Sequence, residues 1–259
     1  MWHKRFGHVS FGYLKHLFPE LFLNASPPLF KCETCELAKS HRVPFPPSLN
    51  KSPLPFTLIH SNVWGPTKVS TLNGSRWFVS FIDDHSRMTW VCLMKTKQDV
   101  CSLFKQFYSM VDTQYKTSIQ VLRIDNGREF VNHEMKQFLH GQGIIHQTTC
   151  LYSPQQNRVA ERKNRHLLVR ATLFEANMPL HYWGKSLTTA LCIINHIPSR
   201  SLDFHTPLDT LNQSLSSPLI PNLPLKVFGC TAFIHIPKHT CHKLQPCALR
   251  CVFVGYGLH

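Results

Sequence analysis

Two histidines and two cysteines near the start of the chain have the spacing of a metal site. His3 and His8 are little more than one helical turn apart, and Cys32 and Cys35 form a Cys-x2-Cys pair. Two imidazoles and two thiolates make a closed tetrahedral set, which suits a structural Zn²⁺ ion. Residues 1–45 are too few to build a sizeable hydrophobic core, so such an ion would help this segment to fold.

Other interpretations of these residues stay open at this point. The same spacing fits surface histidines beside an incidental cysteine pair, and His16 and His41 are rival ligands. The remaining cysteines are scattered, so we expect small buried or semi-buried apolar side chains in a reducing compartment rather than a disulfide framework. They are Cys92, Cys101, Cys150, Cys192, Cys230, Cys241, Cys247 and Cys251.

Two carboxylates farther along the chain are candidates for a second metal site. Asp125 ends a predicted strand, and Glu161 lies on a helix that Ser153 begins as N-cap and Pro154 as first residue. One carboxylate at a strand end and another on a basic helix suit Mg²⁺ that is shared with a phosphate. Asp at a junction between strand and turn is also a common structural residue, so the pair alone is weak evidence for a metal site.

Cations surround Glu161 along the same predicted helix. Arg162, Lys163 and Arg165 are our candidates for contacts with a phosphate backbone. A solvated helix face is the alternative interpretation of these three side chains.

The secondary-structure elements in the middle of the chain must position Asp125 and Glu161. There, three predicted strands are followed by predicted helices and strands in alternation. The order β-β-β-α-β-α-β-α predicts an α/β domain with a mixed sheet and helices on its faces. The predicted strands are 57–64, 76–83, 88–94, 119–124 and 144–148, and the predicted helices are 98–115, 131–140 and one from 153.

Proline-rich stretches divide the chain into three parts. Residues 43–55 form a first linker, because prolines at that density prevent a helix or a central strand. A second stretch, 211–224, precedes two strand-like runs at 227–236 and 249–256. We therefore expect a zinc-binding segment at 1–45, a core at 52–215 and a β segment at 224–259, which ends without an obvious closing element.

The composition restricts the class of partner. The chain has 259 residues with 28 Lys and Arg against 14 Asp and Glu, a formal net charge of +14, and 43% hydrophobic residues. Such a chain has enough apolar residues for a soluble core, and its charge favours a polyanion, most commonly nucleic acid, although basic solubility alone is the alternative. No apolar run approaches the ~18 residues of a membrane helix, and no secretory signal begins the chain. We expect no membrane and no small-molecule cofactor.

Strings along the whole chain resemble the integrase region of copia-type LTR retrotransposon polyproteins. Their order and spacing are specific to that family. They are WHKRFGH (2–8), CETCELAK (32–39), IHSNVWGP (59–66), FIDDHSR (81–87), LRIDNGREF (122–130), GIIHQTTCLYSPQQNRVAERKNRHLL (143–168), WGKSLTTALCIINHIPS (183–199), FGCTAFIHIP (228–237) and CVFVGYG (251–257).

The resemblance implies a fold and an activity for each part. It implies a zinc-binding pre-integrase segment, an RNase H-like catalytic core and a truncated SH3-like β segment. It also implies a D,D-35-E triad that holds two Mg²⁺ or Mn²⁺ ions, with 35 residues between Asp125 and Glu161. The implied reactions are 3′-end processing and strand transfer on DNA, with element ends and target DNA as partners, a possible homo-oligomer, and a nuclear location after assembly in the cytoplasm.

Three positions depart from the family pattern. Asn62 stands where the family has the first catalytic Asp, and Arg128 and Arg158 stand where it usually has Gly. We expect Asp83 and Asp84 to stabilise a turn rather than to replace the missing carboxylate. The sequence therefore predicts a defective integrase, with an inactive DNA-binding relic and a host-recruited interaction protein on the same scaffold as alternatives.

Overall fold

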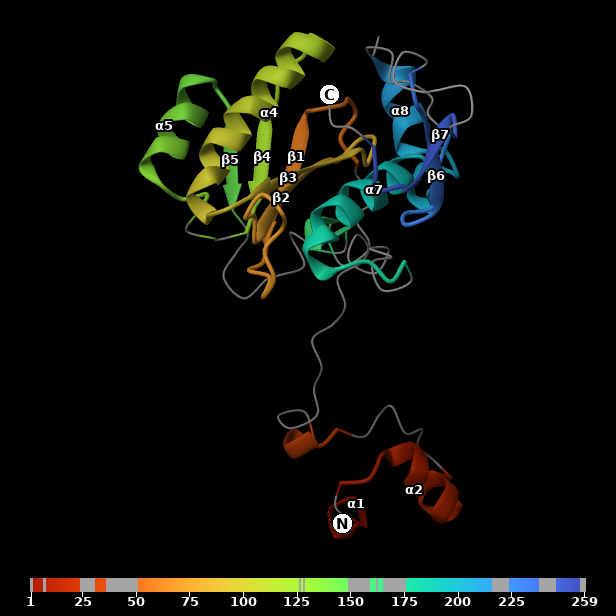
Figure 1. Ribbon diagram of the computed structural model, residues 1–259. Helices are drawn as coiled ribbons and strands as arrows, with labels where there is room; N and C mark the ends of the chain where they lie inside the picture. The colour runs from red at the N-terminus through yellow and green to blue at the C-terminus, as the bar shows by residue number, and fades with distance from the viewer. Residues whose placement is uncertain are drawn as a thin grey trace. The chain divides into compact units, whose positions relative to one another are not determined.

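A computed structural model describes most of the chain in two compact units, Met1–Pro47 and Ser48–His259 (Figure 1). We describe each unit by itself. The described residues are 2–6, 8–23, 31–35, 51–125, 127, 129–148, 159–161, 163–164, 176–215, 224–237 and 246–256.

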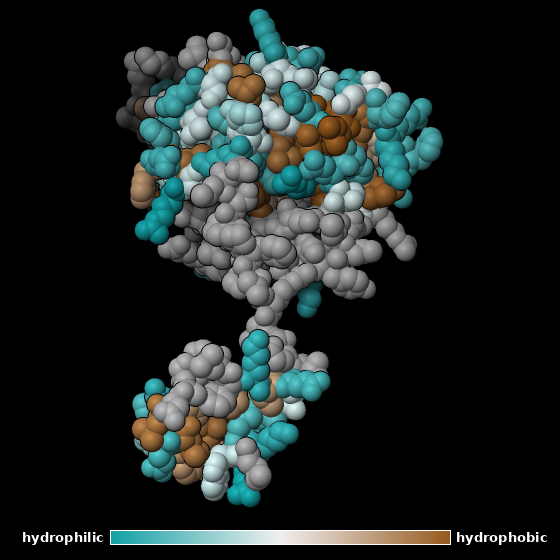
Figure 2. Space-filling model, turned by 180° about the vertical axis from the view of Figure 1, so that it is seen from behind, coloured by the Kyte–Doolittle hydropathy of each residue, from teal (hydrophilic) through white to brown (hydrophobic). Residues whose placement is uncertain are grey.

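The first unit is built from short helices with a very small core. Its elements are α1 (Trp2–Arg5), α2 (Phe11–Leu17) and the 3₁₀ helix η1 (Pro19–Phe22). Ser10 caps α2, because its side chain accepts a hydrogen bond from the backbone N–H of Tyr13. Hydrophobic side chains gather at the surface of this unit (Figure 2). A unit that leaves so much apolar surface in water needs another source of stability, as the sequence predicted.

The second unit contains the predicted mixed sheet. Its strands lie in the order β3-β2-β1-β4-β5, with β2 antiparallel to both neighbours and β4 parallel to both of its neighbours. The carboxyl ends of β1 and β4 therefore meet at the same end of the sheet. The strands are β1 (Leu58–Trp64), β2 (Trp77–Asp83), β3 (Thr89–Met94), β4 (Val121–Ile124) and β5 (Ile145–Thr148).

Helices α4 (Val100–Tyr115) and α5 (His133–Gly141) cover one face of this sheet (Figure 1). The 3₁₀ helix η3 (Lys97–Asp99) leads into α4, and the side chains of Thr96 and Asp99 form a capping box. The apolar face of α4 packs on the strands as its helical periodicity predicted. Its buried side chains are Val100, Cys101, Phe104, Phe107, Val111 and Tyr115.

Helix α7 (Trp183–Asn195) follows the 3₁₀ helix η5 (Leu180–Tyr182) and covers the opposite face. Leu187 and Ile194 of this helix pack against Phe78 and Val91. Asn195 joins the helix to β3: its side chain accepts from Thr89 N at 3.2 Å and donates to Thr89 O at 2.9 Å. The two helical layers and the sheet make the α/β architecture that was predicted.

The end of the chain packs on α7 and differs in detail from the prediction. Helix α8 (Pro207–Ser214) follows the 3₁₀ helix η6 (Arg200–Leu202), so the predicted second linker, 211–224, was wrong at its start. Strands β6 (Thr231–His235) and β7 (Ala248–Val252) form a separate antiparallel pair, shorter than the two predicted runs. At Gly255, with φ +121°, a Cβ would lie 2.7 Å from Thr189 Oγ1, so the backbone approaches α7 closely there.

The described cysteines are all free thiols. Most are buried or half-buried as expected, but Cys247 is exposed because it directly precedes β7 in a pair of strands with little cover. Cys150 and Cys241 lie outside the described residues. Within the described ranges, no helix is both long enough and apolar enough to cross a membrane.

Candidate functional site

The four predicted zinc ligands come together in the first unit. The atoms that His3, His8, Cys32 and Cys35 would offer to a metal all lie within 4.8 Å of one another. Cys35 Sγ is 3.2 Å from His3 Nε2 and 3.5 Å from His8 Nδ1, and Cys32 Sγ is 3.4 Å from His8 Nδ1. Two sulfur and two nitrogen donors at these separations fit a tetrahedral Zn²⁺ site.

Neighbouring groups hold this donor set in place. His3 Nδ1 is 2.8 Å from Val9 O, which directs Nε2 towards the cysteines, and its ring stacks on Phe11 at 4.2 Å. His8 lies after α1 with φ 62°, so a turn rather than one helix face brings the two histidines together. The backbone hydrogen bond from Cys35 and contacts with both histidines lower the pKa of Cys32 to about 6. A thiol that ionises this easily is prepared to bind a cation.

Asn62 lies on β1, and Asp125 directly follows β4, the neighbouring parallel strand. His60 of β1 is paired with Arg123 of β4, and the same register continued by two residues places Asn62 beside Asp125. Both positions face the α7 side of the sheet, because the alternate residues Ile59 and Ile124 belong to the core under α4. The structure thus juxtaposes the first and second predicted site positions at the carboxyl ends of their strands.

The surroundings of Asp125 contain a second carboxylate. Asp125 Oδ1 accepts a hydrogen bond of 3.0 Å from Gly127 N, and a Cβ on Gly127 would be 2.9 Å from that oxygen and 3.0 Å from Glu129 Oε2. Burial is the main cause that raises the pKa of Asp125, and the Glu129 carboxylate adds to it. Lys97 opposes the shift and forms an ion pair of 2.8 Å with Glu129. A bound cation would therefore stabilise the ionised form of the Asp125 carboxyl.

The third predicted carboxylate lies in a partly described helix. Residues 159–161 and 163–164 are helical, with Glu161 exposed and Asn164 buried. No hydrogen bond or ion pair engages Glu161 within the described part of the chain. Of the predicted phosphate contacts, Lys163 is half-buried in the same helix. Arg162 and Arg165, and the departures Arg128 and Arg158, lie outside the described residues.

A buried polar network at the other end of β1 was not predicted. His60 Nε2 donates to Asp84 Oδ1 at 3.0 Å, and Arg87 Nη1 donates to the same oxygen at 2.8 Å. Burial raises the pKa of Asp84, but the hydrogen bond from His60 and the charge of Arg87 outweigh it and hold that pKa well below its usual value. Burial lowers the pKa of His60. The network gives the buried His60 ring a partner at Nε2, whereas Nδ1 is buried without a hydrogen bond among the described residues.

Asp83 and Asp84 stabilise the β2–β3 turn, as predicted. Asp83 Oδ1 accepts from Phe56 N at 2.8 Å, and Asp83 Oδ2 accepts from Ser86 N and Ser86 Oγ. Asp84 Oδ2 accepts from Ser52 N at 2.9 Å. Both side chains are committed to the turn at the amino end of β1, so neither lies near Asp125.

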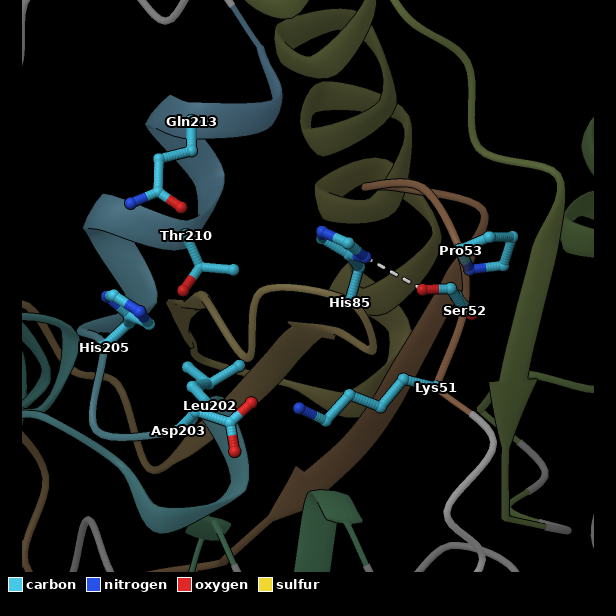
Figure 3. A pocket seen from close by; sticks show the side chains of 9 residues that line it. All are labelled: Lys51, Ser52, Pro53, His85, Leu202, Asp203, His205, Thr210 and Gln213. Carbon is cyan, nitrogen blue, oxygen red and sulfur yellow. Dashed lines mark hydrogen bonds between the residues drawn. The ribbon is translucent and has the colours of Figure 1, made fainter.

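A cavity of about 270 Å³ lies beside this turn (Figure 3). His85 forms part of its wall, with Nδ1 2.9 Å from Ser52 O and Nε2 3.2 Å from Ser214 Oγ. Lys51, which also lines the cavity, donates to Ser201 O. The cavity is at the opposite end of the sheet from Asp125, because it adjoins the turn at the amino end of β1. The lining residues are Lys51, Ser52, Pro53, His85, Leu202, Asp203, His205, Thr210 and Gln213.

Three parts of the chain match known families. Residues 53–154 match the integrase core domain, which includes β1 to β5 with Asn62 and Asp125. Residues 1–40 match the GAG-pre-integrase domain, and residues 230–259 match the retroviral polymerase SH3-like domain. The chain is also 36% identical, over 99% of its length, to the retrovirus-related Pol polyprotein from transposon TNT 1-94 of Nicotiana tabacum.

The chain belongs to the integrase region of copia-type retrotransposon Pol polyproteins. The polyproteins from transposons RE2 and RE1 of Arabidopsis thaliana are 35% and 32% identical to this integrase region. Each alignment covers 99% of the integrase region. The integrase region corresponds to only 19%, 18% and 17% of the lengths of these three relatives.

A solved structure supports the assignment of the fold. A chain of the simian T-cell lymphotropic virus intasome, solved in complex with the PP2A regulatory subunit B56 gamma, has a TM-score of 0.58 to the integrase region. The alignment covers 96% of the integrase region and 87% of that chain, at 19% identity. The mixed sheet with its flanking helices is thus the RNase H-like integrase core that the sequence predicted.

Proposed function

We propose that this integrase region binds DNA and carries a two-metal site for 3′-end processing and strand transfer, with catalysis impaired at Asn62. The observation that carries the proposal is the parallel pairing of His60 with Arg123 within an integrase core, because the same register continued by two residues places Asn62 beside Asp125. Two oxygen-bearing side chains at adjacent strand ends are the arrangement on which a shared divalent cation depends.

The carboxylates of Asp125 and Glu161 are the residues that would hold Mg²⁺ or Mn²⁺. When bound, such ions activate a water or a 3′ hydroxyl and stabilise the leaving oxygen of the phosphate. Asp125 fits this role because its carboxyl is half-buried beside a second acid and has only Gly127 N as a hydrogen-bond donor among the described residues. Lys163, with Arg162 and Arg165, would hold the DNA phosphates near these carboxylates.

The amide of Asn62 removes one negative charge from the site. Its oxygen can contact a cation but contributes no net charge, so Asp125 and Glu161 would supply −2 against two dications. The second ion would then bind poorly, and a loss of ~4 kcal/mol in transition-state stabilisation corresponds to about a thousandfold in rate. We therefore favour a DNA-binding protein with little or no integrase activity over a fully active enzyme.

An assay with labelled element-end duplex and a target plasmid tests this proposal. The unaltered chain should give no detectable end processing or strand transfer with Mg²⁺. Asn62→Asp should restore part of the activity, and adding Asp125→Ala to that variant should abolish it again. Strand transfer by the unaltered chain that Asp125→Ala abolishes would show that the amide at position 62 is tolerated.

The first unit is proposed to bind one structural Zn²⁺ through His3, His8, Cys32 and Cys35. Because the similar viral chain was solved as part of an intasome, we include a homo-oligomer on DNA in the proposal. Action on chromosomal DNA would place the protein in the nucleus after assembly in the cytoplasm. A fluorescent fusion that stays outside the nucleus would contradict this location.

A further inference from the structure

Four cationic side chains lie at the end of the sheet where Asp125 lies. Trp64 at the end of β1 pairs with Phe78, and Trp77 at the start of β2 pairs with Met94 at the end of β3. The residues that follow or precede these positions therefore lie at the same end of the sheet as the carboxyl end of β4. We call the four side chains the basic rim: Lys68, Arg76, Lys95 and Lys97, all of which are exposed.

The loop that carries Lys68 and Arg76 is held firmly by the body of the domain. Thr67 N donates to Arg76 O at 2.8 Å, and Arg76 N donates to Met94 O at 3.0 Å. The Arg76 side chain donates from Nε to Thr67 O at 3.0 Å, which positions its guanidinium. Trp183 Nε1 of α7 donates to Val69 O at 3.0 Å, so the centre of the loop is fixed as well. A cationic surface that is already ordered loses little entropy when it binds.

The rim is continuous with the surroundings of Asp125. Lys95 Cε lies 3.9 Å from the position of a Cβ on Gly74, so Lys95 covers the loop. Lys97 Nζ lies 4.9 Å from the centre of the Trp77 ring and forms the ion pair of 2.8 Å with Glu129. The rim therefore extends from the loop to the carboxylate beside Asp125.

Most of the positive charge on the rim is not neutralised by the protein. Glu129 pairs with Lys97, and Asp99 accepts from the backbone N–H groups of Lys95 and Thr96 at the start of α4. Lys68, Arg76 and Lys95 form no ion pair within the described part of the chain. The charge of Lys95 helps to lower the pKa of the nearby Asp99 carboxyl, but the two side chains form no direct ion pair. Exposed cations without a direct ion pair attract a polyanion.

We infer that the basic rim binds the phosphate backbone of duplex DNA independently of base sequence and leads that duplex to Asp125. This inference rests on the proposed action on DNA and adds a second set of phosphate-binding residues to Arg162, Lys163 and Arg165. The partner is double-helical DNA because its phosphates are dense along the backbone, and contacts with phosphates alone carry no sequence information.

The test measures the salt dependence of binding to a random-sequence duplex by fluorescence anisotropy. The rim variant is Lys68→Gln, Arg76→Gln and Lys95→Gln, which leaves the Lys97–Glu129 pair intact. A matched control variant removes three exposed cations elsewhere in the domain: Lys116→Gln, Lys136→Gln and Arg200→Gln. Far-ultraviolet circular dichroism and thermal melting check that both variants fold.

Each lost phosphate contact should lower the slope of log K against log salt by about 0.9. The rim variant should therefore lose about 2–3 from the slope, whereas the control variant should keep the slope of the unaltered chain. An unchanged slope in the rim variant, or an equal loss in the control, would overturn the assignment of this surface. If the unaltered chain binds DNA without any salt dependence, the proposed function fails together with the inference.

A second set of variants keeps the test decisive if the triple variant does not fold. Lys68→Gln and Lys95→Gln change side chains that form no hydrogen bond among the described residues. Each should lower the slope by about 0.9 without a change in melting temperature. Normal slopes in both single variants would also contradict the inference.

Discussion

The substitution Asn62→Asp examines the site directly, because it changes one amide into a carboxylate of nearly the same shape. Position 62 lies beside Asp125 when the register of β1 and β4 is continued by two residues beyond His60 and Arg123. Without a metal, the new charge faces a carboxyl whose pKa is already raised by burial and by Glu129. We expect the variant to be less stable than the unaltered chain without divalent ions and to recover its stability when they are added.

The expected magnitude follows from the spacing of the strands. Neighbouring strands lie about 4.8 Å apart, so the two carboxylates would be about 5–6 Å apart. At an effective dielectric constant of about 20, two unit charges at that distance repel by about 3 kcal/mol. Both groups are only partly buried, so screening reduces this to about 1–2 kcal/mol in the free energy of unfolding. Mg²⁺ at about 100 times its dissociation constant would return about 2.7 kcal/mol.

Urea denaturation with and without Mg²⁺, followed by tryptophan fluorescence, measures both effects. Trp64 and Trp77 lie near this end of the sheet and report on its unfolding. The double variant Asn62→Asp with Asp125→Asn is the matched control, since it restores a single charge to the pair and should show neither effect. Equal stabilisation of the unaltered chain and of Asn62→Asp by Mg²⁺ would refute the argument about charge.

Three further predictions concern other parts of the structure. Cys35→Ser should lower bound zinc well below one ion per chain and unfold the first unit, as atomic absorption and circular dichroism would show; full zinc content would contradict the site. Burial lowers the pKa of folded His60 below its ordinary value of 6.5, so the unfolded chain takes up the proton first and stability falls as pH drops below 6.5. Urea midpoints from pH 8 to 5 should show less of this decline in His60→Gln, and an identical decline would assign it to other groups. Asn195→Ala should cost about 2–4 kcal/mol in the free energy of unfolding, because both Thr89 backbone groups lose their partner; a loss below 0.5 kcal/mol would mean that water replaces the amide.

Local patterns predicted much of the fold, and long-range register accounts for what they missed. The periodicity over 98–115 predicted α4 because its apolar face packs on the sheet. Helix α8 was missed because it buries little beyond Leu211, and its Pro and Leu residues resemble a linker. Its start does carry two helix signals, the N-cap Thr206 and Pro207.

The candidate sites also divide into one that local spacing predicts and others that depend on long-range register. The four candidate zinc ligands could be predicted to form a cluster because their spacing along the chain is typical of a metal site, and the structure brings them together. The neighbourhood of Asn62 and Asp125 depends on the strand order, which no local pattern specifies. The pair of His60 and Asp84 was missed for the same reason, because the β1–β2 register brings together residues far apart in the sequence.

The hydrogen bonds of Asn195 also decide where this sheet can grow. An outermost strand normally presents unpaired N–H and C=O groups to which another chain can add a strand. At Thr89, the side-chain amide of Asn195 occupies both groups as the backbone of a neighbouring strand would. Strand addition at this point of β3 must therefore break two hydrogen bonds and displace the end of α7. The helix that covers one face of the sheet thus also protects its β3 edge from pairing with other chains.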